Sequence, residues 1–170
     1  QGLSAQFAEH SIERLYKAIV KGVPNPTEGK ISTTIGRSAT DRKKMAVLGP
    51  YDAAREMTPY LKGKHAITHY KTMKSGRDCA LIQCQLETGR THQVRVHMAH
   101  IGHPLIGDPL YGRKRKLKQM GPNESEFVRQ ALHAATLGFI HPISGEKMRF
   151  ESPIPADMQE LLSELFVLTS

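Results

Sequence analysis

Hydrophobic and polar residues alternate with a period of about two over residues 66–73 and 79–86, a pattern typical of strands that bury one face, and five further short stretches also resemble strands. The expected strands are residues 15–20, 31–36, 45–48, 66–73, 79–86, 132–140 and 148–151. Residues 74–78 and 142–145 are rich in turn formers, so they predict tight connections between neighbouring strands. Most of the pairing is therefore expected to be antiparallel.

A helical spacing of apolar residues replaces this alternation in three segments. Ser4 can cap a short helix over residues 4–8, and Pro155 precedes a terminal amphipathic helix over residues 156–167. Val94, Met98 and Ile101 share one face of a helix over residues 91–101. Residues 49–64 and 113–126 lack either period and are expected to be an insertion and a surface loop. The chain is predicted to be one α+β domain over residues 1–170, with a mainly antiparallel, mixed sheet flanked by helices.

The charge of the chain points to a polyanionic partner. Its 170 residues contain 24 Lys and Arg against 16 Asp and Glu, a formal net charge of +8. No long apolar run or lipidation signal is present, so nucleic acid is favoured over a membrane, with a merely soluble basic protein as the alternative. Cys79 and Cys84 lie on one expected strand and make a poor disulfide or metal site. They are interpreted as reduced thiols of an intracellular protein.

The segment over residues 86–112, LETGRTHQVRVHMAHIGHPLIGDPLYG, has a composition that an ordinary core element does not need. Arg90 and Arg95 lie five residues apart, which suggests that a carboxylate or phosphates sit beside them. Four histidines raise the alternative of a metal site, but no Glu lies between them and no cysteine is near. Hydrogen bonds, helix capping or RNA contacts are favoured for these histidines, which are His92, His97, His100 and His103. Asp108, within Gly-Asp-Pro, is interpreted as a turn former rather than a nucleophile.

Four short motifs together resemble the RluA/RluD-type family of RNA pseudouridine synthases. They are ERLYKAIVKG at 13–22, AITHY at 66–70, the block at 89–112, and LHA at 132–134 with HPISG at 141–145. The resemblance implies a pseudouridine-synthase-like catalytic domain that isomerises a uridine within RNA and needs no cofactor and no metal. A uridine in structured RNA must be flipped out to be reached.

The family's essential aspartate lies in a His-Arg-Leu-Asp-x-x-Thr-Ser-Gly-like motif, which the 170 residues do not contain. The family places this motif shortly before the first helix. We therefore expect the chain to be the C-terminal portion of the catalytic domain, truncated at its N-terminal side and inactive by itself.

The resemblance also implies roles for individual residues. Arg95 would pair with the catalytic aspartate, and Tyr16 would contact the flipped base. Leu105 and Leu110 would line the uracil pocket, with core packing as the alternative for both. The expected RNA contacts are Arg90 and His92 near the pocket and, at the basic rim, Arg37, Arg42, Lys43, Arg113 and Arg115, although a run of charge can equally be a solvated face.

The sequence thus predicts an intracellular enzyme, cytoplasmic with an organelle as the alternative, that converts specific uridines to pseudouridine in RNA, with ribosomal RNA as the expected substrate. A non-catalytic RNA-binding module is the main alternative, and a histidine-ligated metalloprotein is the second.

Overall fold

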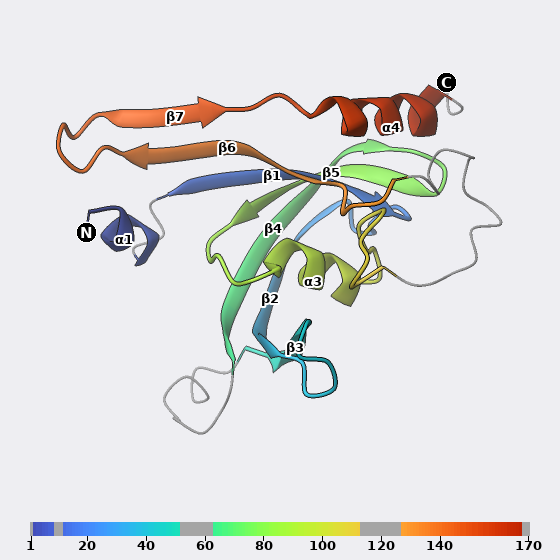
Figure 1. The fold of residues 1–170 in the computed structure, drawn as a ribbon, viewed down its shortest axis with the longest axis horizontal. Coiled ribbons are helices and arrows are strands. Elements are labelled where there is room, and N and C mark those ends of the chain that lie inside the picture. The colour runs from blue at the N-terminus through green and yellow to red at the C-terminus, as the bar shows by residue number, and fades with distance from the viewer. Residues whose placement is uncertain (1, 9–11, 52–62, 113–126, 168–170) are drawn as a thin grey trace.

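The computed structural model describes residues 2–8, 12–51, 63–112 and 127–167, and its centre is one seven-stranded antiparallel sheet (Figure 1). The strand order is β3-β2-β4-β5-β1-β6-β7. The strands are β1 (Glu13–Lys21), β2 (Glu28–Arg37), β3 (Met45–Pro50), β4 (Lys64–Ser75), β5 (Cys79–Leu86), β6 (Leu132–Ile140) and β7 (Lys147–Glu151). Each of the seven expected strands forms, and the predicted α+β class is confirmed.

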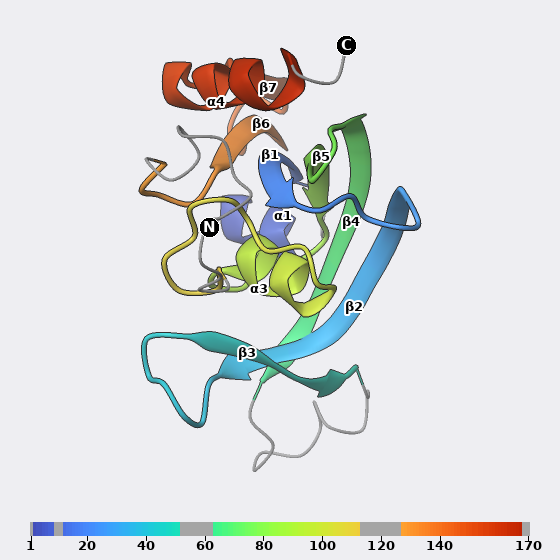
Figure 2. The same cartoon turned by 90° about the vertical axis from the view of Figure 1, so that its right-hand side faces the viewer.

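Three helices accompany the sheet: α1 (Gly2–Ala8), α3 (Gln93–His100) and α4 (Ala156–Val167). The sheet twists strongly, so that β2 and β4 curve around α3 while α4 lies at the opposite end, near β6 and β7 (Figures 1 and 2). The first helix begins at Gly2, and Ser4 lies inside it instead of capping it. The expected insertion at residues 49–64 falls largely outside the described residues, and the expected loop at 113–126 falls wholly outside them.

Alternating side chains of β1 and β5 fill two cores, one on each face of the sheet. Ala18 and Ile82 join the main cluster, in which Val94 and Met98 of α3 are buried. Ile19 belongs to the second cluster, which includes Met158, Leu161 and Phe166 of α4. The two helices are therefore held on the sheet by opposite faces of the same strands.

The segment after α3 is tied to β1 by main-chain hydrogen bonds. Lys21 N donates to Pro104 O at 2.9 Å, and Ile106 N donates to Ile19 O at 2.9 Å. Gly107 then turns with φ +74°, and a side chain there would collide with the carbonyl oxygen of Arg129. This anchored turn fixes the position of the residue that follows it, Asp108.

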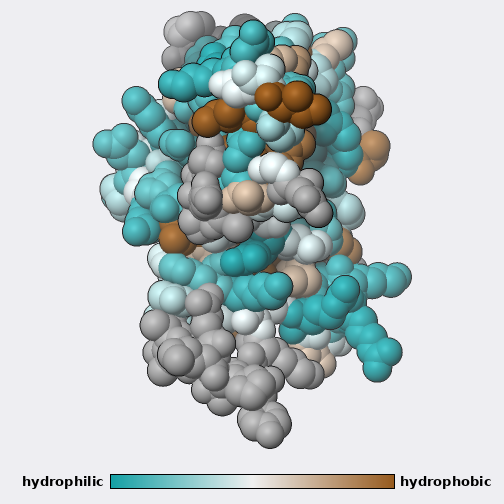
Figure 3. Space-filling model, turned by 90° about the vertical axis from the view of Figure 1, so that its left-hand side faces the viewer, coloured by the Kyte–Doolittle hydropathy of each residue, from teal (hydrophilic) through white to brown (hydrophobic). Residues whose placement is uncertain are grey.

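Exposed apolar side chains gather at the end of the molecule formed by α1 and the β6–β7 hairpin (Figure 3). Ile143 is 92% exposed and Phe150 is 54% exposed. Among the described residues, no helix combines the length and the apolar character required to cross a membrane.

Candidate active site

A buried ion pair between Arg95 and Asp108 forms the centre of the candidate site. Arg95 Nε donates to Asp108 Oδ2 and Arg95 Nη2 donates to Asp108 Oδ1, each at 2.8 Å. The Arg95 side chain is 8% exposed and the Asp108 side chain is fully buried. A guanidinium bound through two parallel bonds cannot swing, so helix α3 presents Arg95 in one fixed orientation.

Asp108 is a turn former, as expected, and it is also the carboxylate beside Arg95. Its Oδ1 accepts the backbone amides of Leu110 at 3.0 Å and Tyr111 at 3.1 Å. Burial by itself would raise the pKa of Asp108, but the hydrogen bonds from Arg95 and from the two amides outweigh it, and the pKa lies below its ordinary value. With both oxygens bound and no exposure, this carboxylate cannot act as a nucleophile.

Arg95 keeps donors for a second acceptor. The bond to Asp108 uses Nε and one hydrogen of Nη2, and within the described ranges Nη1 makes no hydrogen bond. The hydrogen bonds to Asp108 raise the pKa of Arg95, so the cation is permanent. A second carboxylate approaching Nη1 would meet a preoriented positive charge.

Tyr111 and His92 flank the ion pair. The Arg95 guanidinium carbon lies 5.1 Å from the centroid of the Tyr111 ring. The phenol oxygen of Tyr111 accepts the Met45 amide at 2.8 Å and lies 2.8 Å from Nδ1 of His92. His92 has φ 57°, a left-handed conformation that costs a non-glycine residue about 1 kcal/mol. Burial, followed by the nearby charge of Arg95, lowers the pKa of His92.

A buried polar network holds the first turn of α3 against β4. The side-chain amide of Gln93 donates to Ile67 O at 2.9 Å and to Thr68 Oγ1 at 3.0 Å. Its Oε1 accepts the Thr88 hydroxyl at 2.7 Å and the Arg90 amide at 2.9 Å. Four hydrogen bonds from one side chain therefore set where the helix begins and, with it, the place of Arg95.

His97 continues this network one helical turn later. Its Nδ1 lies 2.7 Å from Thr68 Oγ1 and its Nε2 lies 2.8 Å from Thr33 Oγ1. The ring is fully buried, and burial, followed by the charge of His100, lowers its pKa to about 4. His97 is therefore a neutral structural link between α3 and strands β2 and β4.

The structure places the expected pocket residues in different environments. Tyr16 packs against the main core on the face that carries α3 and is partly exposed. Leu105 is fully buried in that core, an environment that fits the core-packing alternative. Leu110 is partly exposed beside Asp108, where a contact with a ligand is sterically open.

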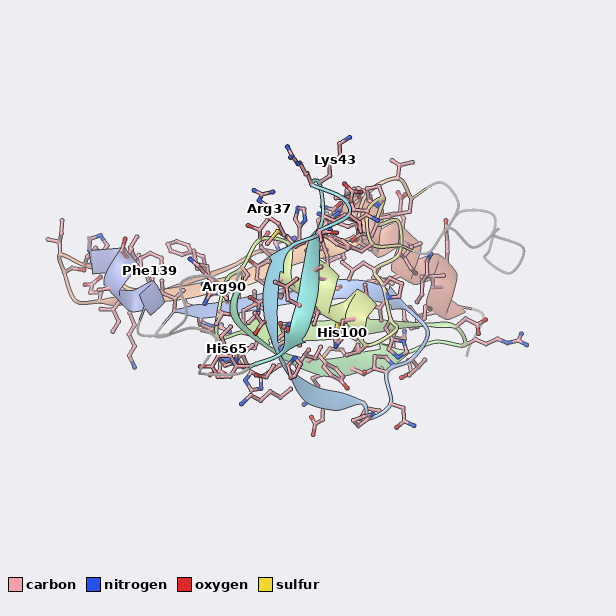
Figure 4. The ribbon with its side chains drawn as sticks, turned by 90° about the horizontal axis from the view of Figure 1, so that it is seen from below. Arg37, Lys43, His65, Arg90, His100 and Phe139 are labelled. Atoms are coloured by element: carbon pink, nitrogen blue, oxygen red, sulfur yellow. The ribbon has the colours of Figure 1, made fainter. Side chains whose placement is uncertain are left out.

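The basic residues predicted to contact RNA form no hydrogen bond with the ion pair where the structure describes them. Arg90 Nε donates to His65 O at 2.8 Å, and the two side chains lie close together in Figure 4. Arg37, at the end of β2, and Lys43, on the connection between β2 and β3, are exposed and point outward in Figure 4, and Arg42 on the same connection is exposed too. Arg113 and Arg115 fall outside the described residues.

The histidines have hydrogen-bonding roles. His103 Nδ1 lies 2.9 Å from Lys21 O, in addition to the contacts of His92 and His97. Over the described ranges, no three side chains of His, Cys, Asp or Glu come close enough to share a metal ion. A groove of about 460 Å³ lies over β2, β4 and β5, where Lys30, His69, Lys71 and Gln85 line it, and none of the predicted site residues does.

Sequence reasoning missed three features of this site. The pairing of Arg95 with Asp108 spans thirteen residues and has no periodic signal. The contact of Tyr111 with Met45 joins elements 66 positions apart. For Gln93 and His97 a signal was available, since residues four apart on a helix share one face.

Comparisons with known proteins agree with the fold and with the family that the sequence resembles. The sequence profile of the family described as RNA pseudouridylate synthase matches residues 1–100. A protein of Zymomonas mobilis named ribosomal large subunit pseudouridine synthase D is 48% identical over 98% of this chain and 49% of its own length. The protein of the same name from Pseudomonas aeruginosa is 44% identical over 96% of this chain and 48% of its own length.

Two solved human structures share the fold. RNA pseudouridylate synthase domain containing 4 superposes with a TM-score of 0.70 at 22% identity, covering 96% of this chain and 66% of that one. RNA pseudouridylate synthase domain containing 1 gives a TM-score of 0.68 at 23% identity, covering 96% and 69%. The chain spans about half the length of the curated relatives it matches.

Proposed function

Because the chain belongs to the RNA pseudouridylate synthase family, of the RluA/RluD type, we propose that the protein containing it converts uridine to pseudouridine in ribosomal RNA. The single observation that carries this proposal is the 48% identity to a ribosomal large subunit pseudouridine synthase over 98% of the chain. The net charge of +8 is consistent with a polyanionic substrate.

The reaction is an isomerisation. The bond between N1 of uracil and C1′ of ribose breaks, the base turns, and a bond between C5 and C1′ forms. C5 loses its proton and N1 gains one, so no cofactor, oxidant or metal is required for the balance. A uridine stacked in RNA is unreachable for this chemistry, and flipping it out costs a few kcal/mol that contacts with the enzyme must offset.

Arg95 is proposed to orient the attacking carboxylate. Its guanidinium is fixed by Asp108, which makes Asp108 a positioning residue, and Nη1 remains for a second acid. A carboxylate at that position would stay ionised and aligned, as a nucleophile must. The family's aspartate motif is not among the 170 residues, so the attacking group would come from the longer polypeptide.

The flipped nucleotide is proposed to contact three side chains, those of Tyr16, Leu110 and Arg90. Tyr16 lies partly exposed on the face that carries α3, where its ring can stack on a base. Leu110 would pack against the base edge. Arg37, Arg42 and Lys43 would contact phosphates at the rim, and the same role is proposed for Arg113 and Arg115.

A tritium-release assay tests the proposal. RNA labelled with tritium at C5 of uridine is mixed with this chain, and with a polypeptide extended upstream to the length of its relatives. Release by the extended protein on ribosomal RNA is expected. Tight RNA binding without release by either protein would instead favour the alternative, a non-catalytic RNA-binding module.

The role of Arg95 is tested by Arg95→Lys, which keeps the charge and loses the two-pronged geometry. In the extended protein we expect kcat to fall about 10²-fold, the scale for losing one preoriented electrostatic contact. RNA affinity should stay within about threefold, since no phosphate contact is removed. Arg77→Lys, on the exposed β4–β5 turn, is the matched control. A collapse of RNA affinity in Arg95→Lys alone would show that Arg95 is a phosphate anchor.

A further inference from the structure

Two arginines from distant parts of the sequence, Arg14 and Arg90, interact electrostatically, and Arg14 also interacts with Tyr16. We propose that Arg14 and Arg90 form one anion site, which binds a single backbone phosphate of RNA next to the base-contacting tyrosine. The proposal rests on the proposed function in that it takes RNA as the ligand. It adds Arg14 as a binding residue and makes the two guanidiniums one site.

The position of Arg14 is set by a glycine. Arg14 and Tyr16 are two residues apart on β1, so their side chains leave the sheet on the same face. A Cβ added to Gly89 would collide with Nη1 of Arg14, so the guanidinium lies directly on the backbone of Gly89. Arg90 follows Gly89 in the chain, and its positive charge lies near enough to Arg14 to lower the pKa of Arg14.

Arg90 is oriented by strand β4. Its Nε donates to the carbonyl oxygen of His65 at 2.8 Å, a bond that fixes the plane of the guanidinium. In the part of the chain that the structure describes, neither Nη nitrogen of Arg90 makes a hydrogen bond. These are the two donors that a phosphate engages in the end-on geometry of guanidinium.

The electrostatics of the pair suit an anion. Burial lowers the pKa of Arg14, the neighbouring Tyr16 raises it, and the positive charge of Arg90 lowers it further. Two like charges at close range repel, and an anion between them removes the repulsion.

A phosphate is the anion that fits a base-flipping enzyme. The flipped nucleotide carries a phosphodiester on each side of its ribose, so a ring that stacks on the base has phosphates within reach. Holding one of them helps to keep the nucleotide rotated out of its stack. Two arginines that bind one phosphate also fix the position of the RNA along its backbone without recognising its sequence.

The test is a double-mutant cycle on RNA affinity in the full natural polypeptide. The probe is a fluorescein-labelled single-stranded oligouridylate of about 12 nucleotides, and binding is followed by anisotropy at about 50 mM and 200 mM salt. The variants are Arg14→Gln, Arg90→Gln, both together, and Arg77→Gln as the charge-matched control on an exposed turn. Thermal unfolding confirms that each variant is folded.

We expect each single variant to lose about tenfold in affinity at low salt, as for one charge-assisted contact. The double variant should lose only about 30-fold instead of about 100-fold, because both arginines bind one phosphate. Arg77→Gln should change affinity by less than about twofold. A loss in Arg14→Gln no greater than that of Arg77→Gln overturns the proposal, and so does a double loss equal to the product of the single losses.

Two further variants separate binding from folding. Gly89→Ala leaves Arg14 in the sequence but displaces its guanidinium, so it should lose affinity as Arg14→Gln does. Arg14→Lys keeps the charge and should bind within about threefold of the natural protein. If Gly89→Ala binds RNA normally, the site is not where we place it. If the double variant loses less affinity than the product of the single losses, but the protein releases no tritium, only the proposed function is refuted. If the protein releases tritium but the affinity losses of Arg14→Gln and Arg90→Gln multiply, only this anion site is refuted.

Discussion

Protonation of His97 is expected to destabilise the fold in mild acid. The imidazole is fully buried, and both ring nitrogens lie within 2.8 Å of threonine hydroxyls. Thr68 Oγ1 accepts a hydrogen bond from Gln93 and can donate its own hydrogen to Nδ1. A second ring proton removes that acceptor and places a charge in a site without water, which is why burial lowers the pKa of His97 to about 4.

The sign and size of the effect follow from linkage. The unfolded chain binds a proton at His97 below its ordinary pKa of 6.5, whereas the folded protein resists protonation until about pH 4. Between these values the unfolded state holds more protons, so stability falls as the pH falls. The difference of about 2.5 pH units corresponds to about 3 kcal/mol in full, and to roughly 2.5 kcal/mol by pH 4.5. That is a large share of a typical stability of about 5–15 kcal/mol.

Urea unfolding at several pH values between 7.5 and 4.5 measures this loss. His97→Gln should be less stable at pH 7.5 by about 1–3 kcal/mol, because it disturbs buried hydrogen bonds, but its stability should be nearly flat over the same range. His100→Gln, an exposed position on the same helix, should keep the acid-dependent loss. If the natural chain and His97→Gln lose stability in parallel, the acid sensitivity belongs to other groups and the reasoning is wrong.

Two further predictions concern buried groups. Asp108→Asn should lower the free energy of urea unfolding by about 3–5 kcal/mol, because Arg95 is left as an uncompensated buried cation; a change below about 1 kcal/mol would show that water reaches the pair. Burial raises the pKa of the Cys84 thiol to about 12, so it should resist iodoacetamide at pH 8 in the folded protein and react once urea unfolds it. Rapid alkylation of the native protein would contradict that burial.

The elements of the fold could be predicted because each has a local cause. The period-two pattern of β5 buries Ile82 and Cys84 on one face, and the helical spacing of Val94 and Met98 directs α3 onto that face. Turn formers at residues 74–78 and 142–145 join neighbouring strands, as expected. Cys79 and Cys84 both lie on β5, as expected, and both are buried.

The arrangement of the site could not be predicted in the same way. Arg95 was expected to hold a carboxylate, but nothing in the sequence showed that Asp108 would occupy two of its donors. Leu105 belongs to the motif and yet lies in the core, since its main chain is bound to β1. The position of Arg14 could not be predicted, because its guanidinium lies where a side chain at position 89 would be, and Gly89 is 75 positions further along the chain.

The sequence by itself determined the strands, the helices, the basic charge and the family, because periodicity, composition and motifs are properties of neighbouring residues. Only the tertiary structure decided which side chains meet: Arg95 with Asp108, Tyr111 with Met45, and Arg14 with Gly89. The physical reason is that these contacts join segments far apart in the chain. Their geometry comes from the twist of one sheet around α3, which no local pattern encodes.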